Sequence, residues 1–163
     1  MIKSKFRLWS FLTLILALFI LVMLIVITIY AFKTPMGVAL FPFCLVVALF
    51  IFALIWLVFG ELRTKNISGS IEEDRISTRN FLGLGPQKIY AFRELDGFSI
   101  SILPSRQGDY EYLYLLKNNR KLVKLSQFYH RNYAEMKQFI GKKTKYLGFE
   151  KFSLLRELRE VFT

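Results

Sequence analysis

The sequence of 163 residues is short of cysteine and histidine, with one of each, Cys44 and His130. One thiol excludes an internal disulfide, and so few Cys and His side chains exclude zinc knuckles and multi-histidine metal sites. Acidic residues are also scarce, 12 against 23 Lys and Arg, so the formal net charge is +11. With 54% hydrophobic residues and a mean hydropathy of +0.38, the chain is too apolar for a disordered protein. These values predict a membrane protein with a basic polar part.

Charged residues are missing altogether from two runs of 24 residues each, 9–32 and 36–59. A bilayer core about 30 Å thick needs about 20 apolar helical residues, and a run of this length rises about 36 Å. Both runs are therefore expected to span a membrane, and the short linker 33–35 makes them an antiparallel hairpin over residues 1–60. A cleaved signal peptide is the alternative for the first run, but the apolar part of a signal peptide has only about 7–15 residues.

Basic residues at the ends of the two runs predict their orientation. Those before the first run and after the second are Lys3, Lys5, Arg7, Arg63 and Lys65. The linker carries Lys33 alone, so the positive-inside rule places both termini in the cytoplasm of a multi-pass inner-membrane protein. Trp9 and Trp56 fall at the same expected face, where indole rings favour the headgroup level. Residues 61–163 then form a cytoplasmic domain.

Alternation of apolar and polar residues begins near residue 66 and is clearest at 98–102, as in a half-buried strand. The other expected strands are 66–72, 75–81, 87–92, 110–116 and 120–125. Asn118 and Asn119 tolerate positive φ and favour a tight type I′ hairpin. Six short strands in succession predict an antiparallel sheet.

A helical pattern replaces the alternation after Asn132. Asn132 and Glu135 have the spacing of a capping box, and one face repeats through Tyr133, Met136, Ile140 and Leu147. The prediction is a helix of about four turns that Gly148 ends. Ser153 is expected to cap a second, amphipathic helix that packs on the domain or, alternatively, on the membrane or a partner. Its apolar stripe is Leu154, Leu155, Leu158, Val161 and Phe162.

This order of elements resembles the bacterial pleckstrin-homology-like (PH-like) membrane proteins, on the stretches 70–76 and 88–98 and the helix from Asn132. The resemblance covers residues 66–150. It implies an α+β membrane protein, in which a two-helix transmembrane hairpin precedes a PH-like antiparallel sheet or partial barrel with a C-terminal capping helix. It also implies a binding platform without catalysis. The family fold has seven strands where six are expected here, and the acidic turn 72–74 argues against phosphoinositide recognition at that hairpin.

Basic residues concentrate in the stretch 117–145, which has nine of them against the single acid Glu135. Near an anionic inner leaflet each contributes about 1 kcal/mol, within a Debye length of about 8 Å. The candidate contacts to anionic lipid headgroups or a partner are Lys117, Arg120, Lys121, Lys124, Lys137, Lys142, Lys143 and Lys145. A merely solvated surface is the alternative. Nucleic acid, with Tyr129 and Tyr133 as stacking rings, is not expected because no known nucleic-acid-binding motif is present.

Catalytic motifs are also missing from the sequence. The segment 83–85 has two glycines but lacks the later glycine of a dinucleotide fingerprint, and it precedes a strand. His130 has no carboxylate near it in the sequence and is interpreted as a surface or turn histidine. The acids at 72–74 are expected to face solvent instead of binding a divalent cation. No catalytic residue, metal ligand or cofactor is therefore expected.

The sequence thus predicts a membrane-anchored, non-catalytic interaction module. Its PH-like domain would bind a partner protein, at a sheet edge or beside the capping helix, or dock on the anionic inner leaflet. The alternative is an accessory or assembly subunit of a membrane complex, with its specificity in the transmembrane helices.

Overall fold

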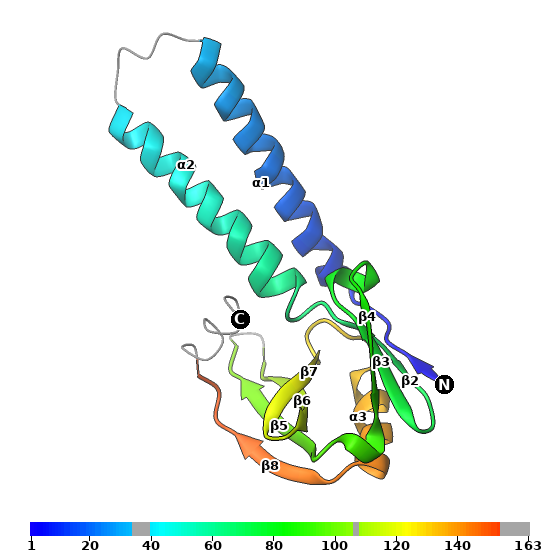
Figure 1. Cartoon of the computed structure of the whole chain (residues 1–163). Helices are drawn as coiled ribbons and strands as arrows, with labels where there is room; N and C mark the ends of the chain where they lie inside the picture. Colours follow the sequence, from blue (N-terminus) through cyan, green and yellow to red (C-terminus); the bar gives the residue numbers. More distant parts are fainter. Residues whose placement is uncertain (34–39, 106–107, 154–163) are drawn as a thin grey trace.

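Two long helices lie side by side at one end of the molecule, and the strands and a third helix form a domain at the other end (Figure 1). The structure is a computed structural model that describes residues 1–33, 40–105 and 108–153. Helix α1 covers Leu8–Lys33, and α2 covers Leu40–Ile55 and continues as the π-helix η1, Trp56–Leu62. The first expected helix is confirmed. The second runs on to Leu62, and residues 34–39 lie outside the described part of the chain.

Both helices are long and apolar enough to cross a membrane, over Leu8–Lys33 and Phe41–Leu62. In each, only 6% of the most apolar 18-residue stretch is buried inside the protein. The threonine hydroxyl groups on α1 form hydrogen bonds within the helix. Thr13 Oγ1 donates to the carbonyl of Trp9 at 3.2 Å, and Thr28 Oγ1 to that of Leu24 at 2.7 Å. Such bonds to the preceding turn satisfy the hydroxyl groups, so that no unpaired O–H donor remains at these positions.

The strands form two four-stranded sheets. The first sheet has the order β1-β2-β3-β4, all antiparallel, with β1 Ile2–Lys3, β2 Ser68–Ile71, β3 Arg75–Arg79 and β4 Gln87–Ala91. The second has the order β7-β6-β5-β8, with β5 Gly97–Leu103, β6 Tyr110–Lys117, β7 Arg120–Ser126 and β8 Tyr146–Glu150. In this sheet β8 runs parallel to β5 and the other pairs are antiparallel.

All six strands expected from the alternating pattern are confirmed, as β2 to β7. The turn between β6 and β7 also has the expected geometry, because Asn118 and Asn119 have φ of 51° and 58°. Two further strands were not expected. One is β1, which lies before the first helix, and the other is β8, which follows the third helix.

Helix α3, Tyr133–Lys143, is shorter than the sequence predicts. The predictions that Leu147 lies on the helix and that Gly148 ends it are wrong, since both residues belong to β8. The backbone N–H of Phe98 donates to the carbonyl of Lys145 at 2.9 Å, which brings this segment onto β5. A Cβ atom at Gly97, where φ is +151°, would lie 2.2 Å from that carbonyl oxygen. Only glycine therefore permits the approach. The second helix expected after Ser153 lies outside the described residues.

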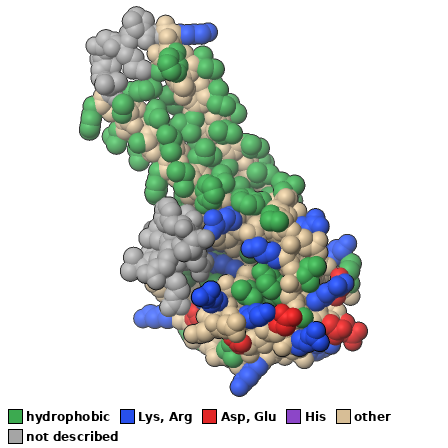
Figure 2. All heavy atoms as spheres, in the orientation of Figure 1, with side chains coloured by type: hydrophobic (Ala, Val, Ile, Leu, Met, Phe, Trp, Pro, Cys, Tyr) green, Lys and Arg blue, Asp and Glu red, His purple; other side chains and the backbone are tan. Residues whose placement is uncertain are grey.

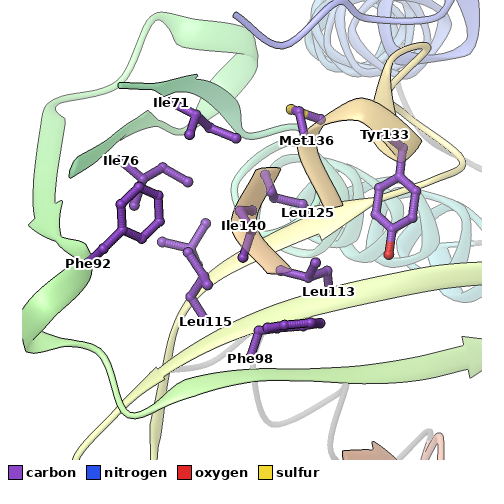
Figure 3. Packing of buried hydrophobic residues seen from close by; sticks show 11 residues of the cluster. Ile71, Ile76, Phe92, Phe98, Leu113, Leu115, Leu125, Tyr133, Met136 and Ile140 are labelled. Carbon is purple, nitrogen blue, oxygen red and sulfur yellow. The ribbon is translucent and has the colours of Figure 1, made fainter. Parts of the chain in front are cut away.

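The hydrophobic core lies between the two sheets and α3 (Figure 3). The first sheet contributes Ile71 and Ile76, the second contributes inward-facing residues such as Leu113 and Leu115, and α3 contributes its buried face. On α3 that face consists of Tyr133, Met136 and Ile140. Alternate residues of β6 that face outward form a second buried cluster, Tyr112, Tyr114 and Leu116, against which Phe152 packs.

Candidate functional site

The start of α1 is fastened to the domain by hydrogen bonds to Tyr129, in the connection between β7 and α3. The carbonyl of Tyr129 accepts from the backbone N–H of Arg7 at 2.9 Å and from Ser10 Oγ at 3.1 Å. The Ser10 side chain is fully buried. The connection between β7 and α3 therefore holds the start of α1 against the domain.

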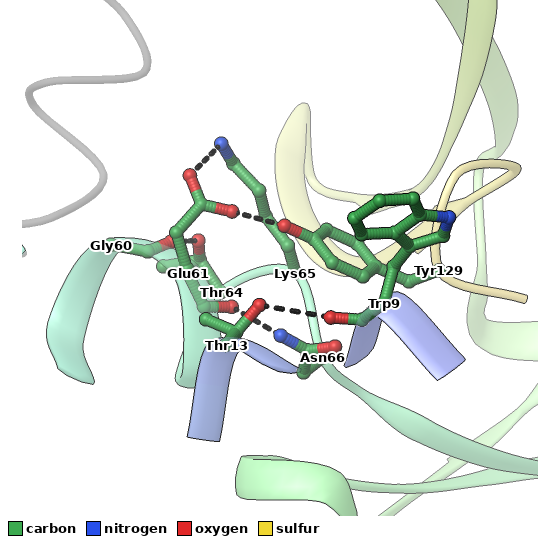
Figure 4. Close-up of polar contacts among 8 residues, drawn as sticks. All are labelled: Trp9, Thr13, Gly60, Glu61, Thr64, Lys65, Asn66 and Tyr129. Atoms are coloured by element: carbon green, nitrogen blue, oxygen red, sulfur yellow. Dashed lines mark hydrogen bonds and ion pairs between the residues drawn. The ribbon is translucent and has the colours of Figure 1, made fainter. Parts of the chain in front are cut away.

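The end of the second helix is fastened to the same turn through Glu61 (Figure 4). The Glu61 carboxylate accepts hydrogen bonds from the Tyr129 hydroxyl and from Lys65 Nζ, the latter at 2.7 Å. Burial, followed by the nearby Glu61 charge, raises the pKa of Tyr129 above its ordinary value. Tyr129 consequently stays protonated and keeps donating. The domain-side ends of both helices, the start of α1 and the end of η1, thus meet at Tyr129; these ends are called the helix bases below.

The N-terminal segment adds a third connection, to Asn132. Asn132 Oδ1 accepts from the backbone N–H of Lys5 at 2.8 Å, and Asn132 Nδ2 donates to the carbonyl of Lys3 at 2.9 Å. The capping box expected from Asn132 and Glu135 is therefore wrong, because the Asn132 side chain makes no cap hydrogen bond to the α3 backbone and, on this helix, bonds only the Glu135 side chain, at 3.5 Å. It holds residues 3–5 against the domain instead.

His130 lies in the connection before α3, as expected, but it is fully buried and not at the surface. Its Nε2 lies 2.8 Å from the carbonyl of Ile67, its Nδ1 lies 2.8 Å from that of Ser126, and the ring lies 5.3 Å from the ring of Phe6. Burial lowers the pKa of His130, and the two carbonyls oppose this shift in part. The imidazole therefore lies between the N-terminal segment, the residue before β2 and the end of β7.

The eight basic residues singled out in the sequence do not form one patch. Four of them form ion pairs with acids, which are Lys117 with Glu94, Lys121 with Glu150, Lys137 with Glu111 and Lys143 with Glu73. Lys124 is buried over the rings of Tyr112 and Tyr114. Arg120, Lys142 and Lys145 are exposed. The end of α3 and the start of β8, where the last two lie, are at the end of the domain opposite the hairpin (Figure 1).

A basic cleft lies at the other end of the domain, next to the end of η1. It has a volume of about 230 Å³. Its basic lining residues are Arg63, Lys88, Lys121 and Lys124. Thr64, Thr78, Asn80 and Tyr114 add polar groups. Among the described residues that line it, none is acidic. Figure 2 shows basic side chains beginning where the hydrophobic hairpin meets the domain.

An apolar groove of about 420 Å³ lies above the cleft, between the two helices and the β3–β4 loop. It is lined by Leu14, Ala17, Leu18, Leu21, Leu54, Val58, Leu62, Phe81, Leu82 and Leu84. The loop reaches the helices through a short 3₁₀ turn at Phe81–Gly83, in which Phe81 and Leu82 have positive φ. Leu84 next to it is 83% exposed. Consecutive residues line the groove and the cleft at two points, since Leu62 and Phe81 line the groove and their chain neighbours Arg63 and Asn80 line the cleft.

Sequence reasoning missed Lys88 and the loop 81–84 as site residues. Arg63 was recognised only as an orientation signal, although it is the first positively charged residue after a long apolar run. A cluster of three or more His, Cys, Asp or Glu side chains suited to a metal ion does not occur in the described part of the chain. No family model, no curated protein and no solved structure matches this chain.

Proposed function

We propose that the chain is a membrane-anchored interaction module without catalytic activity, whose PH-like domain rests against the anionic inner leaflet. In this proposal α1 and α2 with η1 cross the inner membrane as a hairpin, and both termini lie in the cytoplasm. The uncovered apolar surface of both helices supports insertion, because water would otherwise contact it.

The observation that carries the proposal is the attachment of both helix bases to Tyr129. Arg7 and Ser10 at the start of α1, and Glu61 at the end of η1, all bond this one residue. The domain is therefore not on a flexible tether but begins where the helices end. If the helices span the bilayer, the upper surface of the domain lies at the headgroups.

Two features of that upper surface suit an anionic membrane. The exposed Leu84 is adjacent to apolar helix residues, so it can enter the lipid together with them. The basic cleft opens beside Arg63, which directly follows the second candidate span. Helix α3 starts near the helix bases and extends about 16 Å away from the hairpin. Lys142 and Lys143 at its end therefore lie about two Debye lengths from the headgroups. They contribute little to docking.

A partner protein is the second candidate, and β8 favours it. This strand is at the edge of the second sheet and exposes Tyr146, Leu147 and Phe149. An edge strand offers unpaired backbone groups to an extended segment of a partner. Because β8 lies away from the hairpin, such a partner is compatible with membrane docking on the opposite side.

Tryptophan quenching by brominated lipids tests the docking. The only two tryptophans, Trp9 and Trp56, lie at the bases of the helices. The full chain is placed in vesicles that mix phosphatidylcholine with phosphatidylglycerol, with bromine on one lipid at a time. We expect stronger quenching when phosphatidylglycerol carries the bromine, and a smaller difference at about 1 M salt, where the Debye length falls to about 3 Å.

Matched charge variants make the test specific. Lys3→Gln with Lys5→Gln should reduce the preference for brominated phosphatidylglycerol, whereas Lys142→Gln with Lys145→Gln should leave it unchanged. Each pair removes two positive charges. Equal quenching by both lipids at low salt in the unmodified chain would contradict the proposed docking.

A further inference from the structure

The basic cleft and the apolar groove together have the composition of a phospholipid site. From their adjacency we infer that they bind one molecule of an anionic glycerophospholipid, with its phosphate in the cleft and an acyl chain in the groove. The inference rests on the proposed function, because it requires the cleft to lie at the headgroups. It goes beyond that function by replacing general attraction to a charged surface with a defined site.

The groove provides the acyl-chain part of the site. All ten of its lining residues are Leu, Ala, Val or Phe, contributed by α1, by α2 with η1, and by the β3–β4 loop. The loop contributes Leu82 and Leu84 to the same lining as Leu62 at the end of η1. A chain that lies there removes apolar surface from both helices and the loop at once. This joins the lipid to the domain as well as to the hairpin.

The cleft provides the phosphate part. Arg63 and Lys88 form no ion pair with the described residues and can turn to an anion, Arg63 through two parallel N–H groups. Lys121 and Lys124 are held by aromatic rings, since Nζ of each lies over Tyr114, at 3.7 and 5.5 Å. Lys121 also pairs with Glu150 at 2.7 Å, so the direct phosphate contacts are assigned to Arg63 and Lys88. Thr64, Thr78 and Asn80 supply polar groups between them.

The charge of the cleft selects the class of lipid. A zwitterionic headgroup also carries a phosphate, but its cationic end would have to lie among the four basic residues that line the cleft. Phosphatidylglycerol has no such cation. The site is also distinct from the acidic β2–β3 turn, where Glu73 pairs with Lys143 near the end of α3.

Ligand-dependent thermal unfolding of the full chain in a neutral maltoside detergent tests this site. The probes are dihexanoyl phosphatidylglycerol, dihexanoyl phosphatidylcholine and inorganic phosphate, at matched ionic strength. A ligand that binds only the folded state raises the unfolding midpoint in a concentration-dependent way. We expect a saturable rise with phosphatidylglycerol, and a weaker effect from phosphatidylcholine and from phosphate. No saturable rise with phosphatidylglycerol would overturn the site, and an equal rise with phosphate would show that it takes a free anion and not a lipid.

Two variants separate the parts of the site. Arg63→Gln with Lys88→Gln removes two cations of the cleft and should weaken phosphatidylglycerol binding by about tenfold or more. Leu18→Trp fills the groove and should weaken binding of the lipid while leaving the phosphate effect unchanged. Lys142→Gln with Lys145→Gln, and Leu12→Trp on a part of α1 outside the groove, are the matched controls and should bind like the unmodified chain.

The same variants distinguish failure of the site from failure of the docking. If the cleft variant binds phosphatidylglycerol as tightly as the unmodified chain, the site is wrong. The docking still stands in that case if brominated phosphatidylglycerol continues to quench the tryptophans preferentially. If the midpoint rises as expected but that preference is absent, the site is present and the docking on the leaflet is wrong.

Discussion

Deletion of residues 2–6 is expected to destabilise the domain of strands and α3 by on the order of 3–5 kcal/mol, although these residues precede the first helix. The deletion removes β1 from the first sheet, and with it the hydrogen bond from Ser4 N–H to the carbonyl of Gly69 at 2.7 Å. The bond from Arg131 N–H to the carbonyl of Lys5, also 2.7 Å, is lost as well. The fully buried His130 loses the Phe6 ring that lies against it.

Amide hydrogen exchange of the full chain in detergent measures this effect segment by segment. Amides of β2 and β3 should exchange faster after the deletion, because β1 is the outer neighbour of β2. The control variant Lys3→Gln with Lys5→Gln keeps every backbone hydrogen bond of the segment and should exchange like the unmodified chain. Unchanged protection of β2 after the deletion would show that β1 contributes nothing to the domain.

Substitution Glu61→Ala is expected to be the most damaging single change at the base of the hairpin. The Glu61 and Lys65 side chains are only 17% and 14% exposed. The change leaves the Lys65 ammonium without this carboxylate and the buried Tyr129 hydroxyl without its acceptor. Breaking such a pair on one side destabilises by about 2–4 kcal/mol. Glu61→Gln keeps an acceptor for Tyr129 and should cost roughly half as much.

Chemical denaturation followed by the fluorescence of Trp9 and Trp56 measures the effect of Glu61→Ala. Glu135→Ala, an exposed carboxylate on α3, is the control and should change stability by no more than about 0.5 kcal/mol. If Glu61→Ala is as mild as this control, the end of η1 is not held through Tyr129.

The strands β2 to β7 could be predicted because each is encoded locally. Strand β5 alternates apolar and polar residues, β6 is rich in Tyr and Leu, and the Asn118-Asn119 turn fixes one hairpin through the backbone angles of two residues. The strands β1 and β8 could not be predicted in this way. β1 has two residues and pairs with a segment that lies beyond both long helices. β8 depends on the close approach that Gly97 allows, which no local pattern in 144–150 reveals.

The errors at α3 have the same origin. Asn132 has the sequence spacing of a cap, but residues 3–5 compete for its side chain with two backbone groups. The helix ends at Lys143 because Thr144 is extended and its hydroxyl bonds the carbonyl of Ile140 at 2.9 Å. Leu147 continued the helical spacing by coincidence and lies in a strand. Tertiary contacts decided both outcomes.

The candidate site was predictable only in its chemistry. The sequence predicted a basic surface on the domain, and the structure places basic residues in a cleft and, separately, at the end of α3. The density of Lys and Arg along 117–145 did not indicate which of them meet, because four of the eight pair with acids distant in sequence. The cleft combines the residues that follow η1 with residues of β3, β4, β6 and β7, and only the folded arrangement brings Arg63 and Lys88 together.

The most direct test of the central claim is the depth of the β3–β4 loop in an anionic bilayer. A spin label is attached at Leu84→Cys, or for comparison at Arg120→Cys, in a chain that carries Cys44→Ser. If the domain rests against the membrane, the label at position 84 collides more often with apolar oxygen than with a polar nickel complex, and the label at position 120 shows the reverse. Equal access of the nickel complex to both labels would contradict the claim that the domain lies on the bilayer.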